Sequence, residues 1–487
     1  MGQQVDVVVV GSGPNGLAAA VTLARSGLSV RVLEAQTTWG GGARTVDLGL
    51  ASGVVHDLCS AVHPMAIASP FFRRFDLAAR GVELVTPDIS YAQPFDREPA
   101  ALAFRSLERT VAALGPDGAA WRSLFGPLVE RADDVVALLM GDHRHLPPSW
   151  VAALAFGLRT LEQGTGLTWG RRFRGERAQA LLTGVAVHTI TPLPSLPAAG
   201  TALLLGLLAH STGWAIPRGG TQVITDALLG DLQAHGGVVE TGREVRRFED
   251  LPPARAYVFD TTPGTVAGVM GDRLPSRTSR AFQRFRHGSG AAKVDFVLSG
   301  PVPWRDAEVG AAGTVHVGGS RRDMVAAERA VDQGRHADRP NVLLSDPAVN
   351  DPTRQGVRGV RPLWTYAHVP AGSDRDMTEE VTAQIERFAP GFRDVVVAAH
   401  GIPASRMAEH NANYVGGDIS AGAITLRRML VGPVVAPDPY VTGAPGVYLC
   451  SASVPPGPGV HGMGGWHAAR RVLADSFGLL APPDLAP

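Results

Sequence analysis

The sequence predicts an α/β fold that opens on a parallel sheet, and the order of elements at the start of the chain carries this prediction. Val5 to Val10 is a valine-rich run typical of a buried strand. The glycine turn Gly11-Ser-Gly-Pro-Asn-Gly16 follows directly, and an alanine-rich helical run begins at Leu17. Gly27 ends that helix, and a second apolar strand runs from Leu28 to Leu33. Strand, turn, helix and strand in this order form a βαβ unit with parallel strands.

The glycine turn predicts a dinucleotide-binding site. Its first glycine permits a tight bend, the second lets backbone amides approach a pyrophosphate, and the third lets helix and strand pack closely. The pyrophosphate lies at the helix N-terminus in such sites, and an acid at the tip of the second strand accepts hydrogen bonds from a ribose hydroxyl. We therefore expect cofactor contacts from Gly11, Ser12, Gly13, Pro14, Asn15, Gly16, Glu34 and Ala35.

A triple-glycine loop, Trp39-Gly-Gly-Gly-Ala-Arg-Thr45, replaces the third βαβ element of a plain nicotinamide enzyme. Here the sequence resembles the two-dinucleotide-binding flavoproteins, in the branch that contains phytoene desaturases, carotenoid isomerases and related amine oxidases. The resemblance implies FAD as the cofactor. It also implies that this loop covers FAD through Gly41, Gly42 and Ala43, with Arg44 near the phosphates. The alternative for Arg44 is a solvated loop arginine.

A second block begins at Trp214-Ala-Ile-Pro-Arg-Gly-Gly-Thr221, the most family-specific motif in the middle of the chain. Apolar spacing predicts a helix from Thr221 to His235 with Thr221 as its N-cap, then a strand from Val238 to Glu240. The resemblance implies that Val245, which leads into a further strand, contacts the adenine through its main chain. It places Thr262, at the end of a returning strand that begins at Ala256, near the cofactor.

The third block combines a buried strand, Val447 to Cys450, with a Gly/Pro loop and a helix that begins near Gly464. Helix N-terminal amides suit the flavin edge where negative charge accumulates on reduction. The resemblance implies that this loop lies against the isoalloxazine, through Ser451, Gly462, Met463 and Gly464. Amine oxidases carry an acid at this helix start and an aromatic pair beside the flavin. This loop has no acid, and aromatic residues are 6% of the chain, which disfavours an amine cage.

The three blocks divide the chain into two discontinuous domains. We expect an FAD-binding domain from residues 1–69, 214–275 and 435–487, and an inserted α+β substrate domain from residues 70–213 and 276–434. Helical spacing covers Leu124 to Met140 and Trp150 to Leu161, and strand patterns begin at Ala292 and Thr365. Helices packed over a sheet would enclose an apolar chamber, although core packing alone requires the same residues.

Three residues are candidates for catalysis. His63 follows a strand near the expected path of the flavin, together with Ser60 and Ala61, and its imidazole titrates near neutrality. His461 lies inside the loop expected to face the flavin. Arg218 would face the flavin or the substrate, or pair with an acid at the domain seam. For each histidine the alternative is a structural, hydrogen-bonded side chain.

Composition excludes several other classes of protein. The chain has 45 basic and 45 acidic residues, so no net charge marks a nucleic-acid surface. Cys59 and Cys450 form no disulfide framework and no metal cluster, so we expect no metal and a reducing, cytoplasmic compartment. The first strand begins too early to leave room for a cleavable signal. The longest apolar stretch, Ala198 to Ala209, is too short to span a bilayer, while peripheral membrane contact stays open.

These observations predict an FAD-dependent oxidoreductase that removes hydride from a largely apolar small molecule to form a double bond. A second nicotinamide motif is missing from the sequence, so we expect oxygen or a quinone to accept the electrons. A redox-neutral polyene isomerase is the first alternative. A flavin-bound scaffold without turnover and an amine oxidase are the others.

Overall fold

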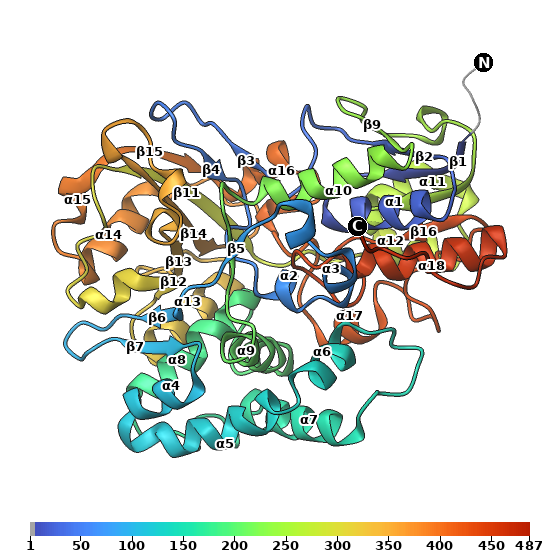
Figure 1. The fold of residues 1–487 in the computed structure, drawn as a ribbon. Coiled ribbons are helices and arrows are strands. Elements are labelled where there is room, and N and C mark those ends of the chain that lie inside the picture. Colours follow the sequence, from blue (N-terminus) through green and yellow to red (C-terminus); the bar gives the residue numbers. More distant parts are fainter. Residues whose placement is uncertain (1–4) are drawn as a thin grey trace.

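A computed structural model describes residues 5–487, and two sheets form its framework (Figure 1). The first sheet has five strands in the order β16-β10-β1-β2-β9, and every neighbouring pair is parallel. Its strands are β1 (Val5–Val10), β2 (Val30–Leu33), β9 (Val238–Glu240), β10 (Ala254–Phe259) and β16 (Val447–Leu449). The predicted α/β class with a parallel sheet is confirmed, and all five strands fall in the three segments assigned to cofactor binding.

Three helices pack around this sheet: α1 (Pro14–Arg25), α10 (Gln222–Ala234) and α18 (Met463–Phe477). The alanines Ala18, Ala19 and Ala20 of α1 are fully buried, and their small side chains let the neighbouring helices approach. The closest approach is at Gly465 of α18, where a Cβ atom would lie 1.8 Å from the carbonyl oxygen of Asn15. Residues from opposite ends of the chain therefore share one core.

The second sheet has seven strands in the order β15-β11-β14-β13-β12-β6-β7 and is mixed, because only β12 and β6 are parallel. The strands are β6 (Ile89–Gln93), β7 (Ala101–Phe104), β11 (Gly290–Leu298), β12 (Ala312–Val317), β13 (Val342–Ser345), β14 (Arg361–Val369) and β15 (Val396–Ile402). The strand patterns expected at Ala292 and Thr365 are part of β11 and β14. Helices α13 (Arg321–Asp332) and α14 (Thr378–Phe388) pack beside this sheet.

A helical layer lies along the lower edge in Figure 1. It consists of α4 (Leu107–Ala113), α5 (Gly118–Val129), α6 (Ala132–Met140), α7 (Trp150–Gly164), α8 (Glu176–Ala186) and α9 (Leu196–Ala209). The single helix expected from Leu124 to Met140 is two helices, because the backbone at Arg131 leaves the helical region and α6 starts anew with an acidic first turn. Within residues 5–487, no helix has the length and apolar composition needed to cross a bilayer.

Helix α7 is unusual because several of its large apolar side chains are exposed on the surface. Its exposed residues are Trp150, Val151, Leu154, Leu158 and Leu161. Helix α9, in contrast, is apolar on all sides and lies inside the helical layer, where most of its side chains are buried. The apolar stretch noted in the sequence is thus a core helix.

Shorter elements connect these layers. They are β3 (Thr45–Val46), β4 (His56–Asp57), α2 (Pro64–Ala68), α3 (Pro70–Phe75), β5 (Leu84–Val85), β8 (Ile216–Pro217), α11 (Pro263–Met270), α12 (Ser276–Gln283), α15 (Phe392–Val395), α16 (Met407–His410) and α17 (Leu426–Val431). The strand expected directly after Val245 is wrong: a 3₁₀ turn, Phe248–Asp250, intervenes before β10. Thr221 precedes α10 as expected, but its side chain does not cap the helix.

Candidate functional site

One continuous cavity of about 470 Å³ runs from the glycine turn after β1 to the seven-stranded sheet. Its first part lies at the carboxyl ends of β1, β2 and β10, where open α/β sheets bind their ligands. The structure brings most of the predicted cofactor contacts to this wall: Gly11, Ser12, Gly13, Pro14, Asn15, Glu34, Ala35, Gly41, Gly42, Ala43, Ser60, Ala61 and Val245. We call this part the dinucleotide end of the cavity.

The glycines of the turn are required by close packing. A Cβ atom on Gly16 would lie 2.2 Å from the carbonyl oxygen of Gly11, and one on Gly13 would lie 2.5 Å from Oδ2 of Asp260. Gly11 has a φ of +97°, a conformation that side chains disfavour. Gly16 lies behind the cavity wall, because its role is to let α1 pack against β1.

Glu34 is held at the tip of β2 by three hydrogen bonds. Its Oε2 accepts from the backbone N–H of Ser12 (2.9 Å) and from the Ser12 hydroxyl (2.5 Å), and its Oε1 accepts from the N–H of Gln36 (2.8 Å). The carboxylate is buried against protein yet lines the cavity. It has the position that the ribose interaction requires.

A second carboxylate at this end, Asp260, is absent from the sequence-based expectations. It directly follows the strand β10, lines the cavity, and accepts a hydrogen bond from the N–H of Gly16 (2.9 Å). Burial, and to a smaller degree the charge of Glu34, raise the pKa of Asp260 to about 7. The sequence did contain a signal for this residue, because an acid directly after a strand that returns to the glycine turn is in a position to reach the cofactor.

Arg44 is buried but does not line the cavity. Its guanidinium donates to the carbonyl of Gly41 (2.9 Å), the hydroxyl of Thr38 (3.2 Å) and the carbonyl of His410. Burial lowers the pKa of Arg44, and none of the ion pairs among residues 5–487 includes it. All three guanidinium nitrogens are occupied by protein acceptors, so Arg44 lies behind the wall of the dinucleotide end, where the charge of Glu34 partly offsets the effect of burial on its pKa.

A loop from the second half of the chain completes the dinucleotide end. Asn413 accepts from the N–H of Thr262 (3.0 Å) and donates to the carbonyl of Asp260 (3.0 Å). The hydroxyl of Tyr414 occupies the space where a Cβ of Gly42 would lie, at 2.0 Å. Residues 410–414 line the cavity. They were assigned to the substrate domain because no sequence motif marks them.

His63 lines the cavity, with one ring nitrogen occupied. The Thr221 hydroxyl donates to the carbonyl of Ser60 (2.7 Å), so it accepts from Nε2 of His63 (2.9 Å). Burial lowers the pKa of His63 to about 4, despite the charge of Asp57. The imidazole is therefore neutral at neutral pH, with Nδ1 as its free acceptor.

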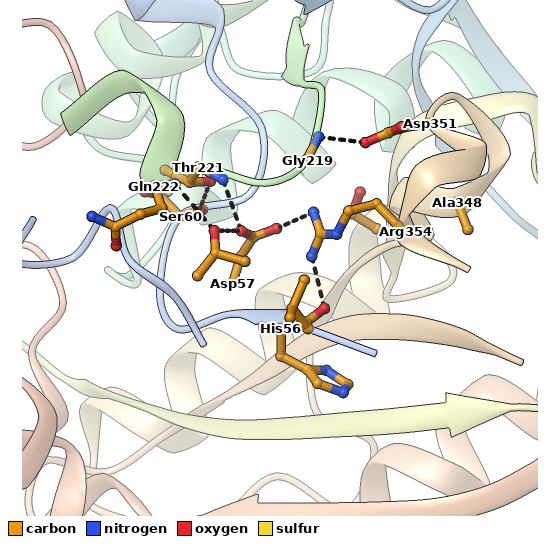
Figure 2. A network of polar contacts seen from close by, with 12 residues as sticks. His56, Asp57, Ser60, Gly219, Thr221, Gln222, Ala348, Asp351 and Arg354 are labelled. Atoms are coloured by element: carbon orange, nitrogen blue, oxygen red, sulfur yellow. Dashed lines mark hydrogen bonds and ion pairs between the residues drawn. The ribbon is translucent and has the colours of Figure 1, made fainter. Parts of the chain in front are cut away.

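Figure 2 shows a buried ion pair between Asp57 and Arg354, to which the Trp214–Thr221 motif contributes the backbone N–H of Thr221. Asp57 accepts from Arg354 (2.9 Å), from the N–H of Thr221 (2.9 Å) and from the hydroxyl of Thr45 (2.6 Å). Burial opposes the charge on Asp57, but Arg354 and these hydrogen bonds hold its pKa below the ordinary value. The side chains of the pair are each 1% exposed. The motif thus fixes the position of Thr221, and through it His63.

Arg218, in the same motif, lies away from the cavity. It donates to both carboxylate oxygens of Glu83 (2.6 and 2.8 Å) and lies 3.5 Å from Asp351, and 38% of its side chain is exposed. The structure therefore gives Arg218 the role of an ion pair at the domain seam, the alternative left open above.

His461 and its neighbours pack behind the wall. His461 is fully buried; Nε2 donates to the carbonyl of Gly457 (3.1 Å), and Nδ1 accepts from the N–H of Met463 (3.0 Å). Both ring nitrogens are used, and neither is available to a ligand. The other expected contacts that the structure leaves off the cavity wall are Thr262, Ser451, Gly462, Met463 and Gly464, although Val460 and Gly459 beside them line it.

The far part of the cavity, which we call the chamber, is mainly apolar. It is lined by Thr201, Leu204 and Leu205 of α9, Met429 of α17, and Trp214, Thr314, Leu343, Ile424, Trp364, Tyr366, His188 and Thr189. The acids among the described lining residues are Glu34, Glu244 and Asp260, all at the dinucleotide end. A cation in the chamber would have no counterion.

Comparisons with known proteins agree with this architecture. Residues 9–75 match the NAD(P)-binding Rossmann-like domain family. An uncharacterised protein of Mycobacterium tuberculosis is 25% identical, over 96% of this chain and 97% of its own length. The rat pyridine nucleotide-disulfide oxidoreductase domain-containing protein 2 is 24% identical, over 96% of this chain and 93% of its own.

Among solved structures, putrescine oxidase bound to putrescine has a TM-score of 0.61 at 18% identity, covering 97% of this chain and 99% of its own. Cyclohexylamine oxidase from Brevibacterium oxydans has a TM-score of 0.54 at 16% identity, covering 97% and 98%. The chain therefore shares its fold with these two oxidases, and the predicted α/β fold class with a parallel sheet is confirmed.

Proposed function

We propose that the protein is an FAD-dependent oxidoreductase that removes hydride from a C–H bond of a largely apolar small molecule and forms a double bond. The observation that carries the proposal is the single cavity, which joins a dinucleotide end to an apolar chamber. Bound FAD would supply the hydride acceptor. A dry, apolar chamber suits this chemistry, because it excludes water and competing charges from the reacting carbon.

The residues of the chain bind and orient. Glu34 would hold a ribose hydroxyl, the backbone of Val245 would face the adenine, and Arg44 would balance phosphate charge. His63, whose Nδ1 is unprotonated, lines the cavity and can accept a hydrogen bond or a proton from the substrate. Oxygen or a quinone would take the electrons, since no second G-x-G-x-x-G turn follows directly on a strand, as Gly11–Gly16 does after β1, to hold NAD(P)H.

The position of the acids favours an apolar C–H substrate over an amine. The two solved oxidases named above act, by name, on putrescine and cyclohexylamine. In this chain the described chamber residues include no carboxylate to neutralise an ammonium group. Amine oxidation is therefore the second candidate, and it requires a neutral amine. A polyene isomerase, the remaining enzymatic alternative, would turn over without consuming an electron acceptor.

The first test is the identity of the cofactor. Purified protein should be yellow, and denaturation should release FAD. Glu34→Arg should weaken FAD binding roughly ten- to a hundredfold, because charge-assisted hydrogen bonds to the ribose, worth about 1.5–3 kcal/mol, are replaced by a bulky cation. Equilibrium dialysis measures the change. Release of NAD or FMN, or unchanged affinity in Glu34→Arg, contradicts the assignment.

The second test is the source of the electrons. In anaerobic stopped-flow measurements, an apolar substrate should bleach the flavin while NADH and NADPH should reduce it slowly or not at all. Rapid reduction by either nucleotide would overturn the proposed direction of electron flow.

A further inference from the structure

The chamber ends at a pair of histidines from two distant segments. His188 belongs to the 3₁₀ turn Val187–Thr189 after α8, and His316 lies on β12. Their Nε2 atoms are 2.8 Å apart, and the rings meet nearly at right angles, with an interplanar angle of 83°. His188 lines the cavity, whereas His316 lies behind it. The pair therefore presents one imidazole to a ligand and keeps the other in the protein.

The remaining ring nitrogen of His188 faces open space. Nε2 is occupied by His316, while Nδ1 has no hydrogen-bond partner within residues 5–487 and is not among the enclosed polar atoms without a partner. Tyr366 also lines the chamber. Its hydroxyl has no partner in the described part of the chain and is not one of those enclosed atoms either. The hydroxyls of Thr201 and Thr314, which also line the chamber, meet the same two conditions. The mainly apolar chamber wall thus carries several hydrogen-bonding groups without a partner in the described chain, and among them His188 is the one backed by a second imidazole.

The His316 ring fits behind the cavity wall because position 184 is a glycine. A Cβ on Gly184 of α8 would lie 2.7 Å from Nδ1 of His316 and 2.7 Å from Oε1 of Gln93. Both of those atoms, and the hydroxyl of Tyr91, are buried without a partner in the described chain. Core packing alone gives no reason to leave one nitrogen of the His316 imidazole and two polar atoms beside it unpartnered, since each costs free energy.

The protonation states of His188 and His316 limit which ligands the pair can bind. Burial lowers the pKa of His188 to about 3, and it lowers the pKa of His316 well below the ordinary value. Both rings are neutral at neutral pH, so one Nε2 donates and the other accepts. When His188 donates, its Nδ1 is an acceptor; when His316 donates, Nδ1 of His188 carries the proton. The chamber wall can therefore accept or donate.

We propose that this wall is a polar subsite in which His188, backed by His316, hydrogen-bonds a neutral hydroxyl group on an otherwise apolar substrate. A hydroxyl both donates and accepts, which matches the two states of the pair. A carboxylate finds no cation there, and an ammonium finds no carboxylate. The inference rests on the proposed function in one respect, that the chamber receives the substrate.

The test uses three probes of one chain length: octan-1-ol, its methyl ether and octanoate. Binding to the protein as purified is measured by isothermal titration calorimetry at pH 7.5. Octan-1-ol should bind more tightly than the methyl ether, which can use only the state in which Nδ1 of His188 donates, and more tightly than octanoate. Equal binding of the alcohol and the ether, stronger binding of octanoate, or no binding of octan-1-ol overturns the proposal.

Variants assign the preference to His188. His188→Leu should abolish the discrimination between alcohol and ether, and His188→Gln, which keeps a donor and an acceptor, should retain part of it. Leu204→Val, on the apolar wall, should weaken both probes equally and preserve their ratio. A full preference in His188→Leu would overturn the assignment.

The outcomes separate this inference from the proposed function. Calorimetry measures binding and requires no redox step. If the protein prefers the alcohol but never exchanges hydride with any substrate, the proposed function is contradicted while the subsite is supported. Rapid flavin reduction by an apolar substrate, without any preference for the alcohol, would support the proposed function and contradict the subsite.

Discussion

The two ends of the cavity are built in different ways. At the dinucleotide end, glycines such as Gly13 and Gly16 let backbone atoms pack close together. Acidic side chains, such as Glu34 and Asp260, line the cavity around this backbone. In the chamber, side chains from separate segments meet, as His188 and His316 do. Backbone geometry leaves a local motif in the sequence, whereas contacts between distant side chains leave none. Cofactor binding is therefore easier to predict than substrate choice.

Two histidines show the same contrast. His461 lies in a glycine-rich loop that a motif identifies, yet both its nitrogens serve the loop itself. His188 has no motif around it, yet it keeps a nitrogen free for a ligand. A motif thus marks where the backbone is constrained, and unsatisfied hydrogen-bonding capacity marks where a ligand can bind.

The largest expected effect tests the backbone frame. Gly465→Ala should lower the free energy of unfolding by at least about 3 kcal/mol, since its Cβ would lie 1.8 Å from the carbonyl of Asn15 and force α18 away from α1. Gly230→Ala in α10, where nothing lies within 4 Å of the added atom, is the matched control and should be neutral or stabilising. Chemical denaturation measures both. Similar stability of the two variants would show that the helix contact is less rigid than described.

The next effect tests the acids at the dinucleotide end. Because burial raises the pKa of Asp260 to about 7, the folded state favours its protonated form. This contribution is present at acid pH and is lost as pH rises through 7, so stability should fall by about 2–3 kcal/mol between pH 5 and 8. Asp260→Asn, which stays neutral, should remove that part of the pH dependence. Denaturation of cofactor-free protein across this range is the measurement, and parallel profiles for the two proteins would contradict it.

The smallest effect tests the histidine behind the wall. His461→Ala should cost about 1–2 kcal/mol of stability, because it removes the hydrogen bonds to Gly457 and Met463. The rate of anaerobic flavin reduction should stay within about twofold of wild type. A loss of about a hundredfold in that rate, the size of a general acid–base contribution, would restore His461 to catalysis.

The sequence predicted the parallel sheet and most of the dinucleotide end, because each of these depends on residues that are neighbours along the chain. Glu34 was expected from its place directly after β2, and the structure puts it in the cavity wall. Asp260 was missed although it ends a predicted strand, since the resemblance directed attention to Thr262. The loop at Asn413 and Tyr414 was missed for a different reason: it reaches the site only through tertiary folding.

The Trp214–Thr221 motif shows that a motif typical of a family can have a structural role instead of a ligand-binding role. The sequence left two roles open for Arg218, contact with the ligand or an ion pair at the domain seam. In the structure the motif serves the Asp57–Arg354 ion pair, and Gly220 is needed because a Cβ there would lie 2.5 Å from the Thr45 hydroxyl. Buried pairs of this kind involve partners far apart in sequence, so no local pattern distinguishes them from a binding site.

The order of strands in the first sheet also constrains how the protein is made. Strand β1 is flanked by β2 and β10, but the outer neighbour of β10 is β16 (Val447–Leu449), and α1 packs against α18 (Met463–Phe477). A ribosome must therefore synthesise more than 400 residues after β1 before this sheet and its helices can be completed. We expect the nascent chain to wait with its N-terminal segment incompletely packed, which makes acquisition of the cofactor a late event in the life of each molecule.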